Sequence, residues 1–497
     1  MGNGGCVGIL KAMTVLTALL SIGLAGQPAA PAAPREARGV WIATVDNIDW
    51  PTNRNLPTAQ ARAELVRIFD EAKRLNLNLV VFQIRPMADA LYDSKLEPWS
   101  EFLTGQMGRA PDGGWDPLKE AIELAHARGM ELHAWFNPYR AGHPGARGPA
   151  SDDHIFEANP ELVRTYGRFL WMDPSEPKVQ QRSLDVMLDV VRRYDVDGIH
   201  IDDYFYPYPI TENGQRVPFP DEANFRRYRD GGGTLSLGDW RRKQVDDFVQ
   251  RLHNSIKREK PWVKFGISPF GIYRPGIPEG IRAGVDQYDE LYADALKWFQ
   301  RGWCDYFTPQ LYWPIDQTAQ SYRTLINWWS SQNTRGIHLW PGNFTSRLWE
   351  NAQGWSTQEI VDQIELTRNT RGATGNIHFS MRAFMQNSQG IADRLAAGPY
   401  ARPALIPASP WIDRTAPSAP RLERANLGVR VGTRDDDVRW IAVYRRSGPE
   451  RPWQLAEVLP ASRGTVGQSL LGGAGQVGIT LIDRAGNESP LEIVPRR

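Results

Sequence analysis

The chain has 497 residues, of which 41% are hydrophobic and 23% charged, and this is typical of a globular protein able to bury a large core. Its formal net charge is +1, so the charge balance does not favour nucleic acid or an anionic membrane surface as a partner. The length suggests two or three domains. The 19 tryptophans mildly favour a carbohydrate ligand, because tryptophan commonly forms the walls of sugar sites.

The amino terminus is typical of a secretory signal. Lys11 precedes the apolar stretch 12–25, and small residues follow at 26–30. Because this stretch is short for a membrane span, we expect residues 1–34 to be a signal peptide and disordered leader; the alternative is an uncleaved anchor. The mature protein would then be exported to the periplasm, cell envelope or medium. Its single cysteine, Cys304, would exclude an internal disulfide.

Eight buried, strand-like segments recur along the chain, each followed by an amphipathic helical pattern. The strands are expected near residues 39–46, 78–85, 131–137, 197–203, 263–269, 305–312, 337–342 and 376–382. The helices are expected at about 58–76, 116–128, 175–194, 240–259, 288–301, 319–332, 357–370 and 388–397. Strict alternation predicts an α/β fold, a (β/α)8 TIM barrel over residues 35–398, rather than a doubly wound sheet.

The alternation of side chains along each predicted strand separates two faces of the barrel. The face expected to pack on the helices is apolar and carries Val80, Phe82, Ile84, Leu132, Ala134, Phe136, Ile199, Ile201, Phe265, Ile267, Phe307, Leu311, Ile337, Leu339, Ile377 and Phe379. The face expected to point inward carries Gln83, Arg85, His133, Asn137, His200, Asp202, Ser268, Thr308, Gln310, Tyr312, His338, Trp340, His378, Ser380 and Arg382. So polar an interior predicts a site at the carboxyl ends of the strands.

The connections after the second, third and fourth predicted strands are long. They run over Pro86–Asp112, Pro138–Asp173 and Tyr204–Asp239, and all three leave the carboxyl ends of their strands. Loops of this length are usually functional, so we expect them to wall a groove around the site.

The fourth predicted strand ends in two carboxylates, Asp202 and Asp203. Carboxylates are costly to desolvate, so a pair at the mouth of a buried strand indicates a functional site more than a helix cap or a solvated loop. Asp202 points inward and is the first candidate for a catalytic carboxylate. The second is Asp203, Asp316 or Asp46, in that order, with Glu279 fourth. Two adjacent carboxylates would repel, which raises one pKa and favours an acid role; alternatively, one aspartate orients the other.

Candidates for substrate binding lie on the inward face or just past the strand ends. They are Asp46, Arg85, Asn137, His200, Tyr204, Ser268, Gln310, Tyr312, Trp313, Trp340, Ser380 and Arg382. The two arginines would bind a substrate carboxylate or pair with Asp202. The amides and the serine suit sugar hydroxyls, and the aromatic rings suit sugar faces, although each type is also common in a core.

Beyond about residue 399 the composition changes. Five prolines between 403 and 420 indicate a linker, expected at 399–416. Segments such as 438–444 (VRWIAVY) and 476–482 (QVGITLI) then alternate apolar and polar residues, which predicts a small all-β sandwich at 417–497. This part resembles a fibronectin type III module, for which attachment or spacing is the expected role.

Several strand-end motifs carry a family resemblance. They are residues 38–42 (RGVWI), 47–51 (NIDWP), 83–86 (QIRP), 133–140 (HAWFNPYR), 197–207 (DGIHIDDYFYP), 266–271 (GISPFG) and 309–313 (PQLYW). Together they resemble the glycosyl-hydrolase-like family 10 of bacteria over about residues 35–396. The resemblance implies an exported (β/α)8 glycoside hydrolase, often followed by a fibronectin-like module. Some relatives are associated with hydrolysis of peptidoglycan glycan strands that lack stem peptides.

A weaker likeness is to the family 18 chitinases, whose fourth strand reads DGxDxDxE. Asp197, Gly198 and Asp202 match, whereas His200 replaces the middle aspartate and Tyr204 stands where the catalytic glutamate would be. This departure puts acetamido-assisted chemistry with a glutamate acid in doubt.

The sequence therefore predicts an exported, endo-acting glycosidase on a cell-wall or related amino-sugar polysaccharide, with a carboxylate acid/base mechanism and no cofactor. Two rival hypotheses remain. His133, His200, His338 and His378 are expected to be hydrogen-bonded core residues, but as metal ligands they would define a metal-dependent hydrolase or deacetylase. No His-x-His pair occurs, so we assign no metal. The second rival is a non-catalytic glycan-binding protein.

Overall fold

The computed structural model describes Met1 and residues 33–350, 352–353, 355–473 and 475–495. The predicted signal peptide, with Cys6, falls outside these residues, and so does the leader up to residue 32. Within the described part, no helix has the length and apolar character that crossing a membrane requires. Cys304 is buried as a free thiol.

Eight parallel strand segments form a closed barrel. They are β1 (Ala37–Ile42), β2 (Leu79–Arg85), β3 (Glu131–Phe136), β7 (Gly198–Ile201), β10 (Lys264–Ile267), β11 (Tyr306–Phe307), the seventh segment formed by β12 (His338–Leu339) and β13 (Gly342–Asn343), and β14 (Gly375–His378). β12 pairs with β11, and β13 pairs with β14. The short segment 338–343 thus joins the two ends of the sheet and closes it, which confirms the predicted (β/α)8 barrel.

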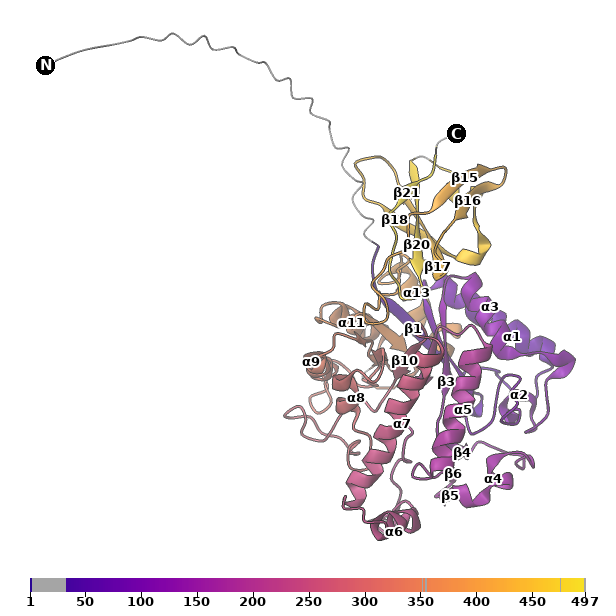
Figure 1. Ribbon diagram of the computed structural model, residues 1–497, viewed down its shortest axis with the longest axis vertical. Helices are drawn as coiled ribbons and strands as arrows, with labels where there is room; N and C mark the ends of the chain where they lie inside the picture. The colour runs from indigo at the N-terminus through magenta and orange to yellow at the C-terminus, as the bar shows by residue number, and fades with distance from the viewer. Residues whose placement is uncertain (2–32, 351, 354, 474, 496–497) are drawn as a thin grey trace. The chain divides into compact units, whose positions relative to one another are not determined.

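The barrel helices surround the strands (Figure 1). They are α1 (Thr58–Arg74), α3 (Pro117–Ala127), α5 (Pro177–Arg193), α7 (Leu237–Glu259), α8 (Ala295–Arg301), α9 (Tyr322–Gln332), α11 (Thr357–Arg368) and α13 (Ile391–Ala397), with the short α12 (Met381–Met385) before the last. Capping explains several boundaries, because Asp116 accepts a bond from the N–H of Lys119 and Ser356 from that of Glu359. α8 begins later than predicted because Asp294 caps it.

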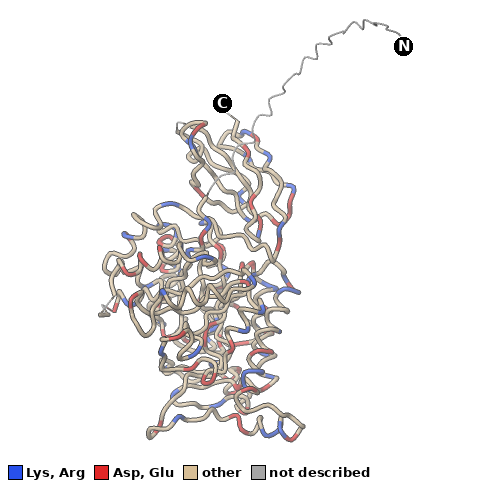
Figure 2. Tube along the Cα trace, turned by 90° about the vertical axis from the view of Figure 1, so that its left-hand side faces the viewer, with Lys and Arg blue, Asp and Glu red and all other residues tan. Residues whose placement is uncertain are grey.

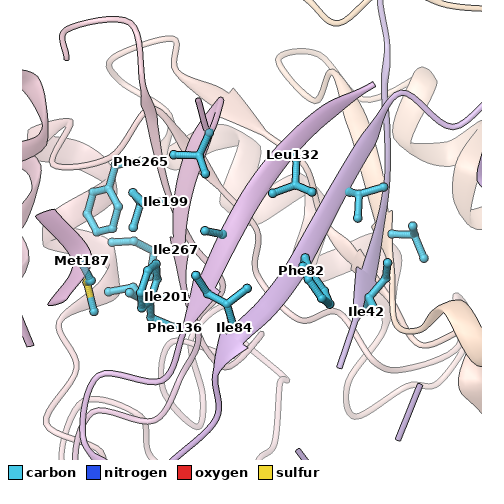
Figure 3. Close-up of a cluster of buried hydrophobic side chains, with 14 of the residues drawn as sticks. Ile42, Phe82, Ile84, Leu132, Phe136, Met187, Ile199, Ile201, Phe265 and Ile267 are labelled. Atoms are coloured by element: carbon cyan, nitrogen blue, oxygen red, sulfur yellow. The ribbon is translucent and has the colours of Figure 1, made fainter. Parts of the chain in front are cut away.

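The outer face of the barrel strands carries the main hydrophobic core. Figure 3 shows side chains of neighbouring strands lying side by side on this face, with Met187 of α5 packed against them. The labelled strand residues are Ile42, Phe82, Ile84, Leu132, Phe136, Ile199, Ile201, Phe265 and Ile267. Burying each such side chain contributes about 1.5–3 kcal/mol. The predicted outward parity is correct for β2, β3, β7 and β10.

The inner face holds a second, aromatic cluster that includes Trp41, Trp135, Tyr306 and Trp340. The phenol oxygen of Tyr306 lies 2.9 Å from Nδ1 of both His133 and His200. These bonds tie β3, β7 and β11 together across the barrel.

The predicted parity of the eighth strand is wrong. Ile377 belongs to the inner cluster, whereas His378 lies outside, 2.9 Å from both the Thr345 and the Tyr400 hydroxyl oxygens. The register explains the reversal: Ile377 is paired with Gly39 of β1, and a Cβ on that glycine would lie 2.9 Å from Cγ1 of Ile377. The missing side chain leaves interior space that Ile377 fills.

The connections between the barrel strands and helices hold the smaller elements. These are α2 (Glu101–Thr104), β4 (Arg140–Gly142), α4 (Ile155–Ala158), β5 (Val163–Tyr166), β6 (Phe169–Met172), β8 (Thr211–Glu212), β9 (Gln215–Arg216), α6 (Glu222–Asp230) and α10 (Ser346–Trp349). β4, β6 and β5 form a small antiparallel sheet in which Arg140 is paired with Trp171. This sheet makes the third connection a structured wall.

The C-terminal part consists of two antiparallel sheets. One has the order β15 (Arg421–Ala425), β16 (Gly428–Gly432), β19 (Thr465–Gly467); the other has the order β18 (Gln454–Pro460), β17 (Val438–Arg446), β20 (Gln476–Asp483), β21 (Glu492–Ile493), and α14 (Gln468–Leu471) follows β19. Val429 and Val466 of the first sheet share a core with Ile441 and Ile479 of the second. The region is therefore a β-sandwich.

Polar contacts join Ser409, Trp411 and the sandwich to the amino ends of the barrel strands. The Trp411 indole N–H donates to Asp305 Oδ1 at 3.0 Å, and His338 Nε2 lies 2.9 Å from the Ser409 hydroxyl oxygen. Arg439 pairs with Asp197 at 2.9 Å. The end of the barrel opposite the predicted site is thus covered by the chain's own C-terminal part.

Figure 2 shows basic and acidic residues interspersed along the whole described trace.

A substitution inside the barrel tests this packing. Gly266→Ala would place a Cβ 1.8 Å from Cζ of Tyr306. We therefore expect the free energy of unfolding, measured by urea titration, to fall by about 1–3 kcal/mol. Gly284→Ala is the matched control, because no neighbour lies within 4 Å of its Cβ position. Equal stability of the two variants would contradict the packing described here.

Candidate active site

A cavity of about 290 Å³ lies at the carboxyl ends of the barrel strands. Inward-facing strand residues and the connections after β1, β3 and β7 contribute to its wall. The lining residues are Trp41, Ala43, Val45, Ile48, Gln83, Trp135, Arg140, His143, Asp202, Asp203, Tyr204, Tyr208, Ser268, Gln310, Tyr312 and Phe379. Carboxylate, amide and aromatic groups from consecutive strands thus meet in one place.

Asp202 follows the last residue of β7 and is only 3% exposed. Its Oδ2 accepts a bond from the Trp135 indole N–H at 2.9 Å and a weaker one from the Asn137 amide at 3.4 Å. Burial, reinforced by the neighbouring charge of Asp203, raises the pKa of Asp202 to about 7, although Arg140 acts in the opposite direction. Near neutral pH this carboxyl group therefore holds a proton part of the time.

Asp203 is 5% exposed and lines the same cavity. Burial raises its pKa as well, but hydrogen bonds from Tyr208 and Gln310 and the charge of Arg140 favour its ionised form. The Tyr208 hydroxyl donates to Oδ2 of Asp203, and the pKa of this phenol is raised far above its ordinary value by burial and by Asp203. The hydrogen bonds thus favour the charge on Asp203, and that charge favours the proton on Asp202.

The cavity floor is a hydrogen-bonded interior layer. His200 Nε2 lies 2.9 Å from the Ser268 hydroxyl oxygen and accepts from the Trp41 indole N–H at 3.3 Å. Burial lowers the pKa of His200 well below its ordinary value, so the ring is neutral. It positions Ser268 and Trp41 and carries no charge into the site.

One wall is basic and comes from the third connection. Arg140 lies with its guanidinium carbon 4.9 Å from the centre of the Tyr204 ring, and its Nε donates to the Pro86 carbonyl at 2.8 Å. Burial, and then the charge of Arg140, lowers the pKa of His143 to about 4. At neutral pH the wall therefore presents one cation, Arg140, and a neutral imidazole.

Of the fifteen site residues predicted from sequence, six line the cavity and two more lie directly behind it. Asp202, Asp203, Tyr204, Ser268, Gln310 and Tyr312 line the cavity. Two more lie directly behind it, since His200 supports Ser268 and Asn137 contacts Asp202. The inward parity of the third to sixth strands was sufficient to identify most of them.

Arg85 does not reach the cavity. Its guanidinium is fully buried, is paired with Glu97 and donates to the Asn137 carbonyl at 2.6 Å. A register shift between Gln83 and Arg85 in the pairing of β2 with β3 turns it away from the interior. Neither expected partner, a substrate carboxylate or Asp202, is therefore within its reach.

The three further carboxylate candidates lie elsewhere. Asp46 is 48% exposed and faces Arg54 at 3.4 Å. Asp316 is exposed on the loop after β11, and Glu279 is exposed on the loop after β10. None of the three lines the cavity.

The remaining candidates for substrate binding lie beside the cavity or beneath it. Trp313 packs edge-on against Phe270, and Trp340 lies deeper, stacked on Tyr306. Ser380 donates to Asp49 at 2.7 Å, and Arg382 lines a neighbouring cavity of about 310 Å³ that shares Ile48 with the first.

Several lining residues were not among the predicted site residues. They are Trp41, Ala43, Val45, Ile48, Gln83, Trp135, Arg140, His143, Tyr208 and Phe379. Trp135 alternates with His133 and Asn137, so its inward direction was available from parity. Arg140, His143 and Tyr208 lie on connections, where no periodicity reports direction.

The four strand histidines do not converge. His133 and His200 share Tyr306, His338 lies at the amino end of the barrel near Ser409, and the side chain of His378 faces the outside of the barrel. In the part of the chain that the structure describes, the one group of three potential metal ligands is Asp413, Asp437 and Asp483, away from this cavity. The geometry therefore does not favour the metal-dependent alternative.

A closed (β/α)8 barrel with a carboxylate pair in an aromatic cavity at its carboxyl end has the architecture of glycoside-hydrolase-like barrels. Sequence comparison identifies the family.

The sequence profile of the family glycosyl hydrolase-like 10 matches residues 36–357. The chain is 40% identical over 442 residues to glycosyl hydrolase YngK of Bacillus subtilis (strain 168), covering 85% of each protein. It is 38% identical over 316 residues to glycosyl hydrolase DigH of Escherichia coli (strain K12), covering 59% of this chain and 69% of that protein. The β-amylase catalytic domain of Paenibacillus polymyxa aligns with a TM-score of 0.48 at 11% identity, covering 72% of this chain and 95% of that one.

The chain therefore belongs to the glycosyl hydrolase-like 10 family, as its strand-end motifs indicated.

The raised pKa of Asp202 predicts a pH-dependent stability. Between about pH 4 and 7 the folded protein keeps this proton while the unfolded chain has released it, so stability falls as pH rises through this window. Asp202→Asn removes the group, and we expect the variant to exceed the wild type by about 2–4 kcal/mol at pH 8, with a smaller difference at pH 4. Urea titrations at both pH values measure it.

The matched control is Asp247→Asn, an exposed aspartate on α7 that pairs with Lys243. We expect its difference from the wild type to be the same at both pH values. A constant difference for Asp202→Asn as well would contradict the assigned proton.

Proposed function

We propose that this protein is an exported glycosidase that hydrolyses a cell-wall or related amino-sugar polysaccharide. Family membership supports the reaction class, and the predicted secretory signal supports export. Peptidoglycan glycan strands lacking stem peptides are the substrate that the family resemblance suggests. The C-terminal sandwich, which we infer to be the fibronectin type III-like module of residues 417–497, would follow the 35–398 barrel through the 399–416 linker.

The observation that carries the proposal is the carboxylate pair in its buried cavity. Glycoside hydrolysis needs a carboxylic acid that can protonate the leaving oxygen near neutral pH. Asp202, with a pKa raised to about 7, meets this requirement, and Trp135 holds it in place through Oδ2. Tyr208 and Gln310 favour the charged form of Asp203, which would supply the negative charge that an oxocarbenium-like transition state favours.

Neighbouring groups suit the binding of a sugar. Tyr312 and Phe379 present aromatic surface, with ring centres 6.0 Å apart, to the cavity. Gln83 accepts bonds from the N–H groups of Thr44 and Val45 through Oε1, while its buried Nε2 has no partner among the described residues. A sugar hydroxyl would satisfy this donor.

A matched pair of variants tests the assignment of Asp202. Wild type, Asp202→Asn and the control Asp247→Asn are incubated with denuded peptidoglycan and with chitin oligosaccharides, and fragments are quantified by mass spectrometry. We expect Asp202→Asn to lower turnover by about 10²–10⁴-fold, because the general acid is removed, and Asp247→Asn to leave it unchanged.

Equal turnover by wild type and Asp202→Asn would remove Asp202 from the mechanism. Glycan binding without turnover by any of the three proteins would favour the non-catalytic alternative.

The pH profile provides a separate prediction. Because the acid must hold its proton, we expect kcat/KM to fall about tenfold per pH unit above about pH 7, measured on chitin oligosaccharides from pH 4 to 9. At lower pH, activity falls again as Asp203 gains a proton. A rate that rises from pH 7 to 9 would contradict the acid role.

A further inference from the structure

The cavity receives its carboxylates from a single wall. Among its described lining residues, Asp202 and Asp203 are the only acidic side chains, and both come from the end of β7. Their Cα atoms are adjacent and therefore about 3.8 Å apart. In a double-displacement glycosidase the nucleophilic carboxylate and the acid flank the scissile bond instead. The wall formed by the end of β1 and its loop offers Trp41, Ala43, Val45 and Ile48, none of which is a nucleophile.

The other lining groups do not supply a strong nucleophile either. Burial raises the pKa of Tyr204, Tyr208 and Tyr312 above the ordinary phenol value, so these hydroxyls stay protonated. The loop after β1 carries two carboxylates that do not line the cavity: Asp46 is half-exposed and faces Arg54. Asp49 accepts bonds from the Ser380 hydroxyl and the Arg382 N–H and lines the neighbouring cavity. His143 is neutral and could only act as a base toward water, which would invert the anomeric configuration.

We propose that the nucleophile belongs to the substrate: the sugar in the cavity carries a 2-acetamido group whose carbonyl oxygen attacks its own anomeric carbon. This inference rests on the proposed glycosidase function and specifies its substrate class as a 2-acetamido-2-deoxy sugar on the non-reducing side of the cleaved bond.

The two aspartates then take different roles. In the first step the acetamido oxygen forms a bond to C1, the bond from C1 to the leaving oxygen breaks, and Asp202 gives its proton to that oxygen. Asp203 accepts a hydrogen bond from the acetamido N–H and stabilises the positive charge of the cyclic oxazolinium. In the second step water attacks C1 and loses a proton to Asp202, and the C1–oxygen bond of the ring breaks to restore the acetamido group.

The cavity surface fits the group that this mechanism requires. Trp41, Ala43 and Trp135 line it and belong to one buried apolar cluster, which suits the acetamido methyl. Trp135 also donates to Asp202 Oδ2, so the apolar surface and the acid are fixed relative to each other. The hydroxyl of Tyr208, which comes after Asp203 in the chain, donates to Asp203 and holds this second carboxylate in place.

The test compares substrates that differ only at the 2-position. The full chain is incubated with oligomers of N-acetylglucosamine, with the same oligomers after de-N-acetylation, and with denuded peptidoglycan. We expect the de-N-acetylated oligomers to be cleaved at least about 100-fold more slowly, because an intramolecular nucleophile has been removed. Proton NMR of the first product should show retained anomeric configuration.

A second measurement does not depend on turnover. A thiazoline fused across C1 and C2 of N-acetylglucosamine mimics the cyclic intermediate, and its binding is followed by calorimetry. We expect Asp203→Asn to weaken this binding by at least about tenfold, because the charged acceptor for the N–H of the protonated ring nitrogen is lost. The control Asp247→Asn should bind it as the wild type does.

The outcomes separate the two proposals. Equal cleavage of acetylated and de-N-acetylated oligomers, or an inverted product, overturns the acetamido inference and leaves the glycosidase function standing. Failure of the wild type to bind the thiazoline while it cleaves acetylated oligomers also overturns the inference. No cleavage of any of the three glycans contradicts the glycosidase function itself, and the inference falls with it.

Discussion

The shared burial of Asp202 and Asp203 is the constraint around which the rest of the site is organised. Ionising both carboxyls in so enclosed a cavity is costly, so one of them holds a proton near neutral pH. The surrounding groups decide which one. Tyr208 and Gln310 favour the charge on Asp203, and this charge in turn raises the pKa of Asp202. Acid and anion thus arise from two identical side chains at one strand end.

The barrel interior beneath the pair makes this arrangement rigid. Tyr306 joins His133 and His200, and His200 in turn contacts Ser268 and Trp41 at the cavity floor. Burial lowers the pKa of His200 well below its ordinary value, so this ring orients Ser268 and Trp41 without adding a charge beside Asp202.

At the opposite end of the barrel, ion pairs between the barrel and the sandwich stabilise the folded state. Asp197, which precedes β7, is buried, and burial alone would raise its pKa, but Arg439 of the sandwich and His126 hold the pKa well below its ordinary value. A buried charge destabilises the folded state unless it is paired, so Asp197 depends on its partners Arg439 and His126. The C-terminal sandwich is therefore part of the electrostatic environment of the strand that carries the catalytic candidates, rather than a freely attached module.

The amino-acid sequence by itself determined the eightfold alternation, the outward apolar face of most strands, the family and the pair Asp202–Asp203, because these follow from periodicity and from residue types at strand ends. It did not determine the direction of the eighth strand, because that depends on the space left by Gly39 on a distant strand. Nor did it separate Arg85 and Asp46 from the site, since each is held by a partner, Glu97 or Arg54, that only the folded chain brings near. Arg140, His143 and Tyr208 enter the cavity from connections whose paths are set by tertiary packing, and local sequence carries no signal for such a path.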